Sequence, residues 1–311
     1  MGGGGGSYFY GNPEPERLIE SVRSAEQSAA DQEFTSYVCA FLADALAQFN
    51  SRDVEGTQEI LAKVKQELSD EFEDTVGLVF GGSVAKHTYV DGLSDVDALV
   101  ILKETIIEED SPSKLVTLFA DKLRAHFGRN EEIVKEGRLA VTLNIDGKLI
   151  QLLPALRSGE FFKIASSDGQ TWATINPRKF ADKLTSVNQT LDGKLVPVIK
   201  LVKSINGTLP EQRQLKGYHI ESMAINVFKG YVGPRNTKDM LRYFFDKAPE
   251  QCRKPIKDST GQSVHVDEYL GEANSTQRLI LADALGRIGR RLANADGARS
   301  LDEWRSVVGL E

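Results

Sequence analysis

The stretch that decides the fold reads Phe80-Gly-Gly-Ser-Val-Ala-Lys-His-Thr-Tyr-Val-Asp-Gly-Leu-Ser-Asp-Val-Asp-Ala-Leu-Val100. The segment of residues 75–80 ends at Phe80, the first residue of this stretch. It is short and rich in β-branched and aromatic residues, which predicts a strand. Gly81 and Gly82 allow backbone amides to approach a ligand closely, and Ser83 adds a hydroxyl donor. A glycine-rich turn between a strand and a helix is suited to binding phosphate groups.

The second half of the stretch carries two acids on the next predicted strand, residues 95–102. Asp95 and Asp97 are two residues apart, so both carboxylates point to one face of the strand. Val96, Ala98 and Val100 lie on the opposite, core face. Like charges this close are unfavourable unless a cation lies between them. Mg²⁺ is held by one or two carboxylates together with phosphate oxygens. The pair therefore predicts a site for Mg²⁺ or Mn²⁺.

Each half of the motif alone has a plainer explanation. A Gly-Gly-Ser is usually only a turn, and an Asp-x-Asp is usually a solvated strand end. Here eleven residues separate Gly82-Ser83 from Asp95, and strand patterns lie on both sides. The combination predicts a site that binds a nucleoside triphosphate with a divalent metal and transfers nucleotidyl groups.

Around this motif the sequence predicts a mixed α/β (α+β) part followed by a helical part. Residues 1–30 are a Gly-rich tip and a polar stretch, and are expected to be flexible. From Asp31 apolar residues recur at helical spacing, namely at Phe34, Tyr37, Val38, Phe41, Leu42, Ala45 and Phe49. A helix is predicted over about residues 113–127, and helical periods dominate beyond Pro177.

The best hairpin signal is Asp146-Gly147, which separates the predicted strands 138–145 and 148–153. A two-residue turn at this point pairs Gln151 with Thr142. In this pairing no acid lies opposite Gln151.

Composition narrows the classes of function. The chain has 311 residues and a net charge of −7, from 38 Lys and Arg against 45 Asp and Glu. Proteins that coat duplex DNA usually carry a basic excess, so DNA binding is not supported. Cys39 and Cys252 lie too far apart for a CxxC pair or a zinc finger. No apolar run approaches the ~18 residues of a membrane span, and no signal peptide is recognisable, so a cytoplasmic protein is expected.

The motif resembles the signature of the DNA polymerase β-like nucleotidyltransferase superfamily, a Gly-Ser turn, a spacer, and an Asp-x-Asp on the next strand. Within it the chain is similar to the bacterial cGAS/DncV-like nucleotidyltransferases of anti-phage (CBASS) systems, which carry a basic residue and a threonine where Lys86 and Thr88 stand here. The similarity extends over about residues 30–295. It includes the helical-part segments 201–206, 217–222 and 266–270. One subgroup pairs with a HORMA-domain protein.

The resemblance assigns roles to further residues. The nucleotide would contact Gly82, Ser83, Lys86, Thr88 and Gln151 in the sheet part, and Lys203, Ser222 and, one turn before Lys203, Lys200 in the helical part. On an amphipathic helix both lysines are otherwise a solvated face. His219 and Tyr218 are candidates for stacking on a base, and equally for buried aromatic positions.

One departure from the family concerns a third acid. The family places a carboxylate on the strand that here reads Ile150-Gln-Leu-Leu-Pro-Ala155, at the position of Gln151. An amide offers a carbonyl oxygen to a metal but brings no charge and cannot act as a base. Three outcomes follow: a slow enzyme that uses Asp95 and Asp97 alone, an enzyme that needs a partner, or a protein that binds nucleotide without turnover.

The resemblance also implies an organisation and a product. The fold would be bilobal, with residues 31–175 as the catalytic lobe, braced by the N-terminal helix, and residues 176–311 as the helical nucleotide-binding lobe. ATP and other NTPs would become a cyclic oligonucleotide, with cyclic tri-adenylate as the specific expectation, and pyrophosphate would leave. A HORMA-domain partner and a nuclease effector would act with it. An RNA- or protein-directed nucleotidyltransferase, or a catalytically weak nucleotide-binding module, are the alternatives.

Overall fold

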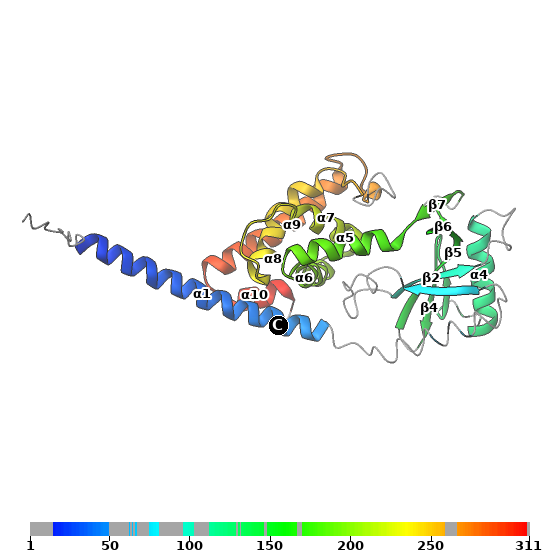
Figure 1. Cartoon of the computed structure of the whole chain (residues 1–311), viewed down its shortest axis with the longest axis horizontal. Helices are drawn as coiled ribbons and strands as arrows, with labels where there is room; N and C mark the ends of the chain where they lie inside the picture. The colour runs from blue at the N-terminus through cyan, green and yellow to red at the C-terminus, as the bar shows by residue number, and fades with distance from the viewer. Residues whose placement is uncertain are drawn as a thin grey trace, which may run out of the picture.

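The computed structural model has a sheet lobe and a helical lobe (Figure 1). It describes residues 15–49, 62, 64, 66, 75–80, 96–102, 112–128, 130, 132–145, 148–166, 170–258 and 266–309. The sheet lobe consists of β1 (Thr75–Phe80), β2 (Val96–Leu102), α4 (Pro112–Phe127), β3 (Val134–Glu136), β4 (Val141–Ile145), β5 (Lys148–Ser158), β6 (Phe161–Ala165) and β7 (Trp172–Ile175). The helical lobe consists of α5 (Pro177–Thr190), α6 (Leu195–Gly207), η2 (Glu211–Arg213), α7 (Gly217–Val227), α8 (Thr237–Cys252), η3 (Glu268–Leu270), α9 (Thr276–Gly297) and α10 (Leu301–Val308).

The described strands form one mixed sheet of seven strands. Along its main path the order is β1-β2-β5-β4-β3, and β6 pairs with both β5 and β7. β2 and β5 run parallel, whereas the other pairs are antiparallel. The predicted α/β (α+β) architecture, a mixed sheet lobe followed by a C-terminal helical lobe, is confirmed.

Helix α4 covers one face of the sheet. Ala98 and Val100 of β2 lie in the core beneath it with Ile150 and Leu152 of β5 and the fully buried Phe119 of α4. The predicted core face of the aspartate-bearing strand is therefore confirmed. Because residues alternate between the two faces of a strand, Asp97 and Gln151 take positions on the face opposite α4.

The predicted hairpin is confirmed by the pairing of β4 with β5. Ile145 pairs with Lys148 and Thr142 pairs with Gln151. The Asp146-Gly147 turn itself lies outside the described residues. β5 continues beyond the predicted end at residue 153 as far as Ser158, because it also pairs with β2 on its other side and with β6 at its end.

The helical lobe has its own apolar core, to which helix α1 (Pro15–Phe49) contributes Phe34, Val38, Leu42 and Ala45. α1 packs against α6, α8 and α10. The inclusion of Tyr37 in the apolar face was wrong, since its side chain is 57% exposed and its hydroxyl donates a hydrogen bond of 3.0 Å to Glu33 Oε1.

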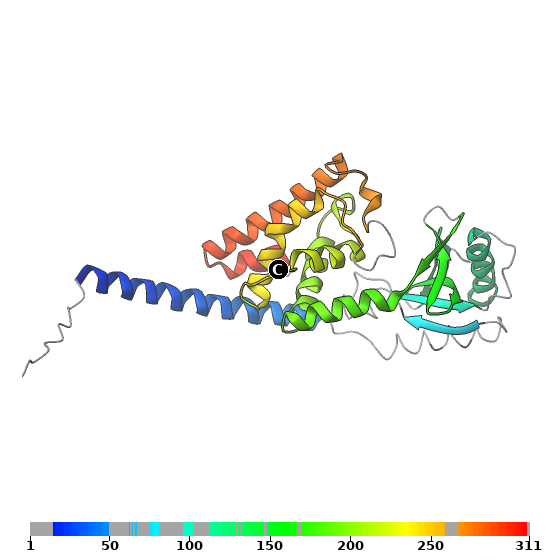
Figure 2. The ribbon, with the colours of Figure 1, turned by 45° about the horizontal axis from the view of Figure 1, so that its top comes forward.

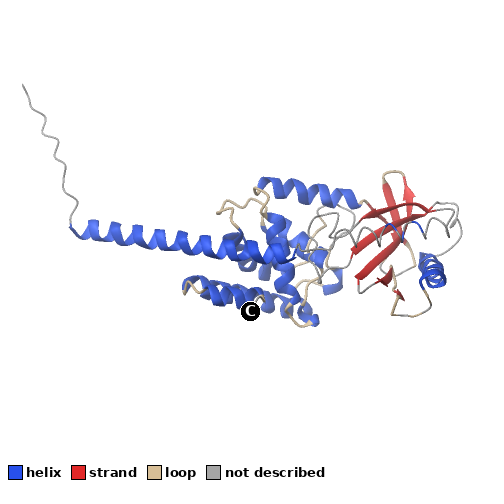
Figure 3. Ribbon diagram, turned by 90° about the horizontal axis from the view of Figure 1, so that it is seen from below, coloured by secondary structure: helices blue, strands red, loops and turns tan. Residues whose placement is uncertain are grey.

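The expected flexible segment of residues 1–30 is helical from Pro15 onward, so the predicted helix start at Asp31 was too late. Proline is favourable in the first turn of a helix, and the Glu, Arg, Ala and Gln residues that follow form helices readily. Residues 16–29 are exposed and carry no apolar stripe that packs. This part of α1 extends away from the other helices (Figure 3).

Helix α5 leads from the sheet lobe into the helical lobe, as its green ribbon in Figure 2 shows. It begins directly after β7, where Asn176 accepts hydrogen bonds from the amides of Arg178 and Lys179 and so caps the helix. Among the described residues, no helix is both long enough and apolar enough to span a membrane.

Candidate active site

The structure describes part of the predicted site. Gly82, Ser83, Lys86, Thr88 and Asp95 lie outside the described residues. Asp97 is placed by the backbone of β2, and Gln151 lies in β5. Lys200, Lys203 and Ser222 belong to the helical lobe, the two lysines on α6 and the serine on α7.

Asp97 and Gln151 are neighbours in the sheet. In the parallel pairing of β2 with β5 they occupy the same register position, and strands lie about 4.8 Å apart. Thr142 of β4 pairs with Gln151 on its other side, so the three residues form one row across three strands. Gln151 is neutral, and no acid on β4 takes the place of the third carboxylate that the resemblance implies.

The end of β1 lies beside the same row. β1 ends at Phe80, as predicted, and Phe80 pairs with Ala98, the residue that follows Asp97. The sequence Gly81-Gly82-Ser83 follows Phe80 directly. Gly81, Gly82 and Ser83 lie outside the described residues, and the structure shows only that the strand before them ends beside the backbone of Asp97 and Ala98.

In the helical lobe, Lys203 is a buried cation rather than part of a solvated face. Its Nζ donates a hydrogen bond of 2.8 Å to Oε1 of Glu221, and the two side chains are 7% and 1% exposed. Lys200 is half-buried on the same helix. Sequence reasoning missed Glu221. A glutamate within the mainly apolar segment of residues 220–227 was a usable signal.

The start of α7 lies next to this pair. A Cβ on Gly217 would be 3.5 Å from Nζ of Lys203, and the N-cap residue, Lys216, makes no side-chain cap. Ser222 is 3% exposed, and its Oγ has no hydrogen-bond partner within the described part of the chain. A helix N-terminus and a cation favour an anion at the same place. This arrangement is able to bind phosphate oxygens.

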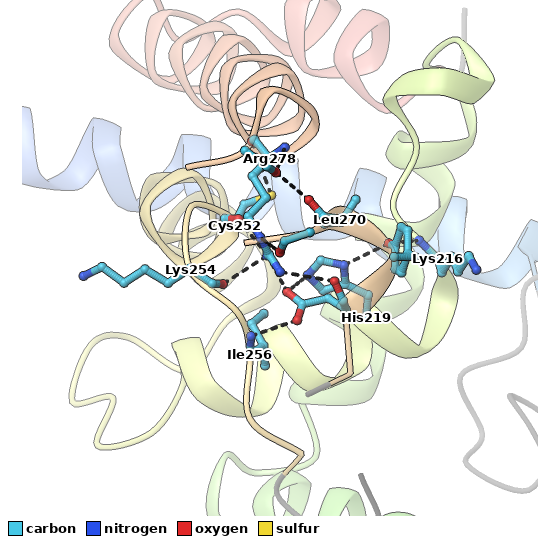
Figure 4. Close-up of polar contacts among 11 residues, drawn as sticks. Lys216, His219, Cys252, Lys254, Ile256, Leu270 and Arg278 are labelled. Carbon is cyan, nitrogen blue, oxygen red and sulfur yellow. Dashed lines mark hydrogen bonds and ion pairs between the residues drawn. The ribbon is translucent and has the colours of Figure 1, made fainter. Parts of the chain in front are cut away.

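A second buried ionic network is centred on Arg278 (Figure 4). Arg278, which is fully buried at the start of α9, donates a 2.6 Å hydrogen bond to Oδ2 of Asp267, also fully buried. Its other bonds reach the carbonyls of Cys252, Lys254, Asp267 and Gly271. Oδ1 of Asp267 accepts from the amide of Ile256. The network therefore joins the end of α8, η3 and α9.

His219 on α7 and Tyr269 on η3 extend this network toward α7. Nδ1 of His219 lies 3.0 Å from the Tyr269 hydroxyl, and its Nε2 lies 3.6 Å from Oδ2 of Asp267. The same hydroxyl accepts from the amide of Lys216, whose Nζ lies 4.4 Å from the centre of the Tyr269 ring. His219 is only 1% exposed, so it is a buried aromatic position. Burial raises the pKa of Tyr269 to about 12, so this residue is a neutral phenol.

The environment of His219 predicts a loss of stability in acid. Burial, assisted by Arg278 and opposed by Asp267, lowers its pKa from 6.5 to about 4. Below about pH 6.5 the unfolded chain binds a proton that folded His219 does not, so the free energy of unfolding falls as the pH falls through this window, by up to about 1.4 kcal/mol per pH unit. Between pH 7 and pH 5 the loss due to His219 should be about 2 kcal/mol.

Urea unfolding at these two pH values measures the effect. His219→Gln should lose about 2 kcal/mol less than the wild type between pH 7 and pH 5. His126→Gln, which changes an exposed histidine on α4, should keep the wild-type dependence. Equal losses in the wild type and His219→Gln would contradict the prediction.

Comparison with known proteins identifies the family. The family model described as the Second Messenger Oligonucleotide or Dinucleotide Synthetase domain matches residues 33–188. That segment is half of the chain and contains the glycine-rich turn, both aspartates and Gln151. Among curated proteins, none matches the sequence significantly.

Solved structures share the fold. The structure of Escherichia coli MS115-1 CdnC with ATP has a TM-score of 0.64 and 18% identity, and the match covers 88% of this chain and 97% of that one. The structure of CdnG of Bradyrhizobium diazoefficiens with GTP has a TM-score of 0.63 and 14% identity, and the match covers 88% of this chain and 96% of that one. The structure of the cyclic AMP-GMP synthase DncV of Vibrio cholerae with a linear intermediate has a TM-score of 0.61 and 14% identity. That match covers 96% of this chain and 90% of that one. Given the family match over half of its length, this chain belongs to the second messenger oligonucleotide or dinucleotide synthetases, nucleotidyltransferases that make cyclic oligonucleotides.

Proposed function

We propose that this nucleotidyltransferase uses ATP to make an adenine-containing cyclic oligonucleotide, cyclic tri-adenylate in the specific form, and acts in anti-phage signalling. The observation that carries the proposal is the row of Asp97 and Gln151 beside the end of β1, within the segment that matches the family. The adenine base is supported by the resemblance and by the solved structure of E. coli MS115-1 CdnC, which contains ATP.

Each candidate residue has a role in this proposal. Asp95 and Asp97 would hold Mg²⁺ or Mn²⁺, which suits a set of carboxylate oxygens and supplies charge neutralisation at the triphosphate when bound. Backbone amides of the turn at Gly82 and the hydroxyl of Ser83 would bind phosphate oxygens, and Lys86 and Thr88 would make further contacts with the nucleotide. Lys203 and Ser222, with Lys200, would contact the triphosphate from the helical lobe. A ribose hydroxyl would attack the α-phosphate, and pyrophosphate would leave.

Gln151 sets the expected rate. Because its amide carries no charge, the metal site has two carboxylates rather than three, and the step that activates the attacking hydroxyl is the one weakened. We propose an active enzyme that depends on a partner for full rate. A nucleotide-binding module without turnover is the second candidate, and the same residue favours it.

The direct test is incubation of the purified chain with labelled ATP, alone and with the other NTPs, in Mg²⁺ or Mn²⁺. The proposal expects a phosphatase-resistant product, equal to a cyclic tri-adenylate standard, and released pyrophosphate. Label bound at stoichiometric amounts without product would favour the binding module. Label transferred to added tRNA or protein would favour an RNA- or protein-directed transferase.

Gln151→Asp is expected to raise the rate of product formation about tenfold, a gain of about 1.4 kcal/mol in transition-state stabilisation, because it places a third carboxylate one strand from Asp97. Gln151→Ala should slow the reaction. Thr142→Asp is the matched control, since it adds the same charge one strand further from Asp97 in the same row. Equal acceleration in Gln151→Asp and Thr142→Asp would count against a metal site beside β5.

A HORMA-domain protein is the proposed partner, and a nuclease that responds to the product is the proposed effector, both in the cytoplasm. The support is the solved complex of E. coli MS115-1 CdnC with HORMA-deltaN, whose CdnC shares the fold of this chain. Co-purification should yield a complex with a higher synthesis rate than the isolated chain. Full activity of the isolated chain, with no complex formed, would contradict the proposal.

The lobe boundaries, residues 31–175 for the catalytic lobe and residues 176–311 for the helical lobe, remain part of the proposed function.

A further inference from the structure

The ion pair between Lys203 and Glu221 is unusual in its burial. The two side chains are 7% and 1% exposed, and their charged atoms lie 2.8 Å apart. Removing two charges from water is costly, and their mutual attraction offsets this cost only with very good geometry. Apolar residues of similar size would stabilise the helix contact at least as well. Packing of α6 against α7 therefore does not explain why this pair is present.

The surroundings of Lys203 make the glutamate necessary. The side chain lies against the start of α7, with Nζ 3.5 Å from the position that a Cβ on Gly217 would take. The N-terminus of a helix carries a partial positive charge, which repels an ammonium group. Glu221 lies one turn further along α7 and places a full negative charge 2.8 Å from Nζ. This charge offsets the repulsion and fixes where Nζ lies.

We infer that Glu221 is a positioning residue, which holds the ammonium group of Lys203 at the start of α7 so that it meets the triphosphate of the bound nucleotide. The inference deepens the proposed function and rests on it, because Lys203 is taken to contact the triphosphate. The hydrogen bond from Nζ of Lys203 to Glu221 fixes the position of the ammonium group. Glu221 thus acts through Lys203 and does not touch the substrate.

His219 and Asp267 do not substitute for Glu221. The imidazole of His219 and the carboxylate of Asp267 belong to the network around Arg278 and Tyr269. This network connects α7 with η3 and α9. Two separate sets of buried polar contacts therefore hold α7, one to α6 and one to η3 and α9. Only the set to α6 contains a residue expected to meet the nucleotide.

The test is a double-mutant cycle on nucleotide affinity. Binding of the non-reactive analogue α,β-methylene-ATP with Mg²⁺ is measured by calorimetry for the wild type, Glu221→Gln, Lys203→Met and the combined variant. Glu221→Gln keeps the shape of the side chain and removes its charge, and should raise the Kd about tenfold. In the Lys203→Met background the same change should leave the Kd unaltered, because the effect passes through the lysine.

Controls separate this role from a structural one. Glu250→Gln makes the same chemical change at a glutamate that is 79% exposed on α8, and should not affect the Kd. Glu221→Asp should recover part of the affinity that Glu221→Gln loses, since it restores the charge. Urea midpoints for each variant show that the folded protein is being compared.

The outcomes also separate the inference from the proposed function. If Lys203→Met weakens binding and Glu221→Gln does not, the inference is overturned while the nucleotide site stands. An equal effect of Glu221→Gln with and without Lys203 would assign Glu221 a structural role and overturn the inference as well. If the wild type and Lys203→Met bind the analogue equally, the contact of Lys203 with the triphosphate is wrong, and the inference is overturned with it.

Discussion

Replacement of both Asp95 and Asp97 by asparagine is expected to abolish product formation, with a fall of at least about a thousandfold, or about 4 kcal/mol of transition-state stabilisation. Asparagine keeps the size of the side chain and removes the charge that holds the divalent cation. With Gln151 beside Asp97, no further acid in the described row compensates. The measurement is the rate of labelled ATP conversion at saturating Mg²⁺, and again with Mn²⁺.

The stability of this double variant should not fall with its activity. Two carboxylates on one face of a strand repel each other, so their removal should leave the urea midpoint equal or higher. Asp121→Asn is the matched control, because it changes a 64% exposed aspartate of the same lobe and should keep full activity. Unchanged synthesis in the double variant would refute the site, whereas a lowered urea midpoint would show that loss of activity reflects unfolding.

Arg278→Met is expected to produce the largest loss of stability, about 3–5 kcal/mol. The substitution leaves Asp267 buried and without its cation, and it removes the donors that meet the carbonyls of Cys252, Lys254 and Gly271. A buried unpaired carboxylate is more costly than the pair itself. The measurement is the free energy of unfolding in urea.

Two further variants define the cause. Arg287→Met changes an arginine of the same helix that is 61% exposed and paired with Asp283, and should cost no more than about 1 kcal/mol. Adding Asp267→Leu to Arg278→Met should recover part of the stability, since no buried charge then remains. A loss in Arg278→Met as small as that in Arg287→Met would show that the buried network contributes little.

Much of the sheet lobe was predictable because its signals are local. An Asp-Gly turn fixes the register of the hairpin, and so the pairing of Gln151 with Thr142 followed from counting residues. The position of the aspartates likewise predicted that the opposite face of β2, with Ala98 and Val100, belongs to the core. On its other side from β1, however, β2 pairs with β5, a parallel partner about fifty positions later in the chain. Such non-local pairing is not encoded in either strand alone.

The helical lobe was predictable in outline but not in its polar interior. Helical periodicity was predicted beyond Pro177, and the apolar residues of α6 that show it, Leu195, Ile199, Val202 and Ile205, are buried. The same spacing made Lys203 resemble a solvated lysine, because a helix pattern does not show which polar residue finds a buried partner on another helix. The links of Asp267 with Arg278 and with His219 escaped prediction for the same reason.

The start of α1 shows a different limit. Its first half has no apolar face, so the hydrophobic pattern that marks a packed helix begins only near Phe34. Helix propensity extends the helix back to Pro15 without packing. A pattern based on burial therefore underestimates a helix that projects from the body of the molecule.

Anomalous diffraction from crystals grown with Mn²⁺ and α,β-methylene-ATP gives the most direct test of the claim that the strand after the glycine-rich turn holds a metal-bound triphosphate. The account predicts a manganese peak about 2–2.5 Å from carboxylate oxygens of Asp95 and Asp97, with phosphate oxygens in the same coordination sphere. Triphosphate density that lies elsewhere, with both carboxylates bonded to protein groups and no manganese between them, would contradict it.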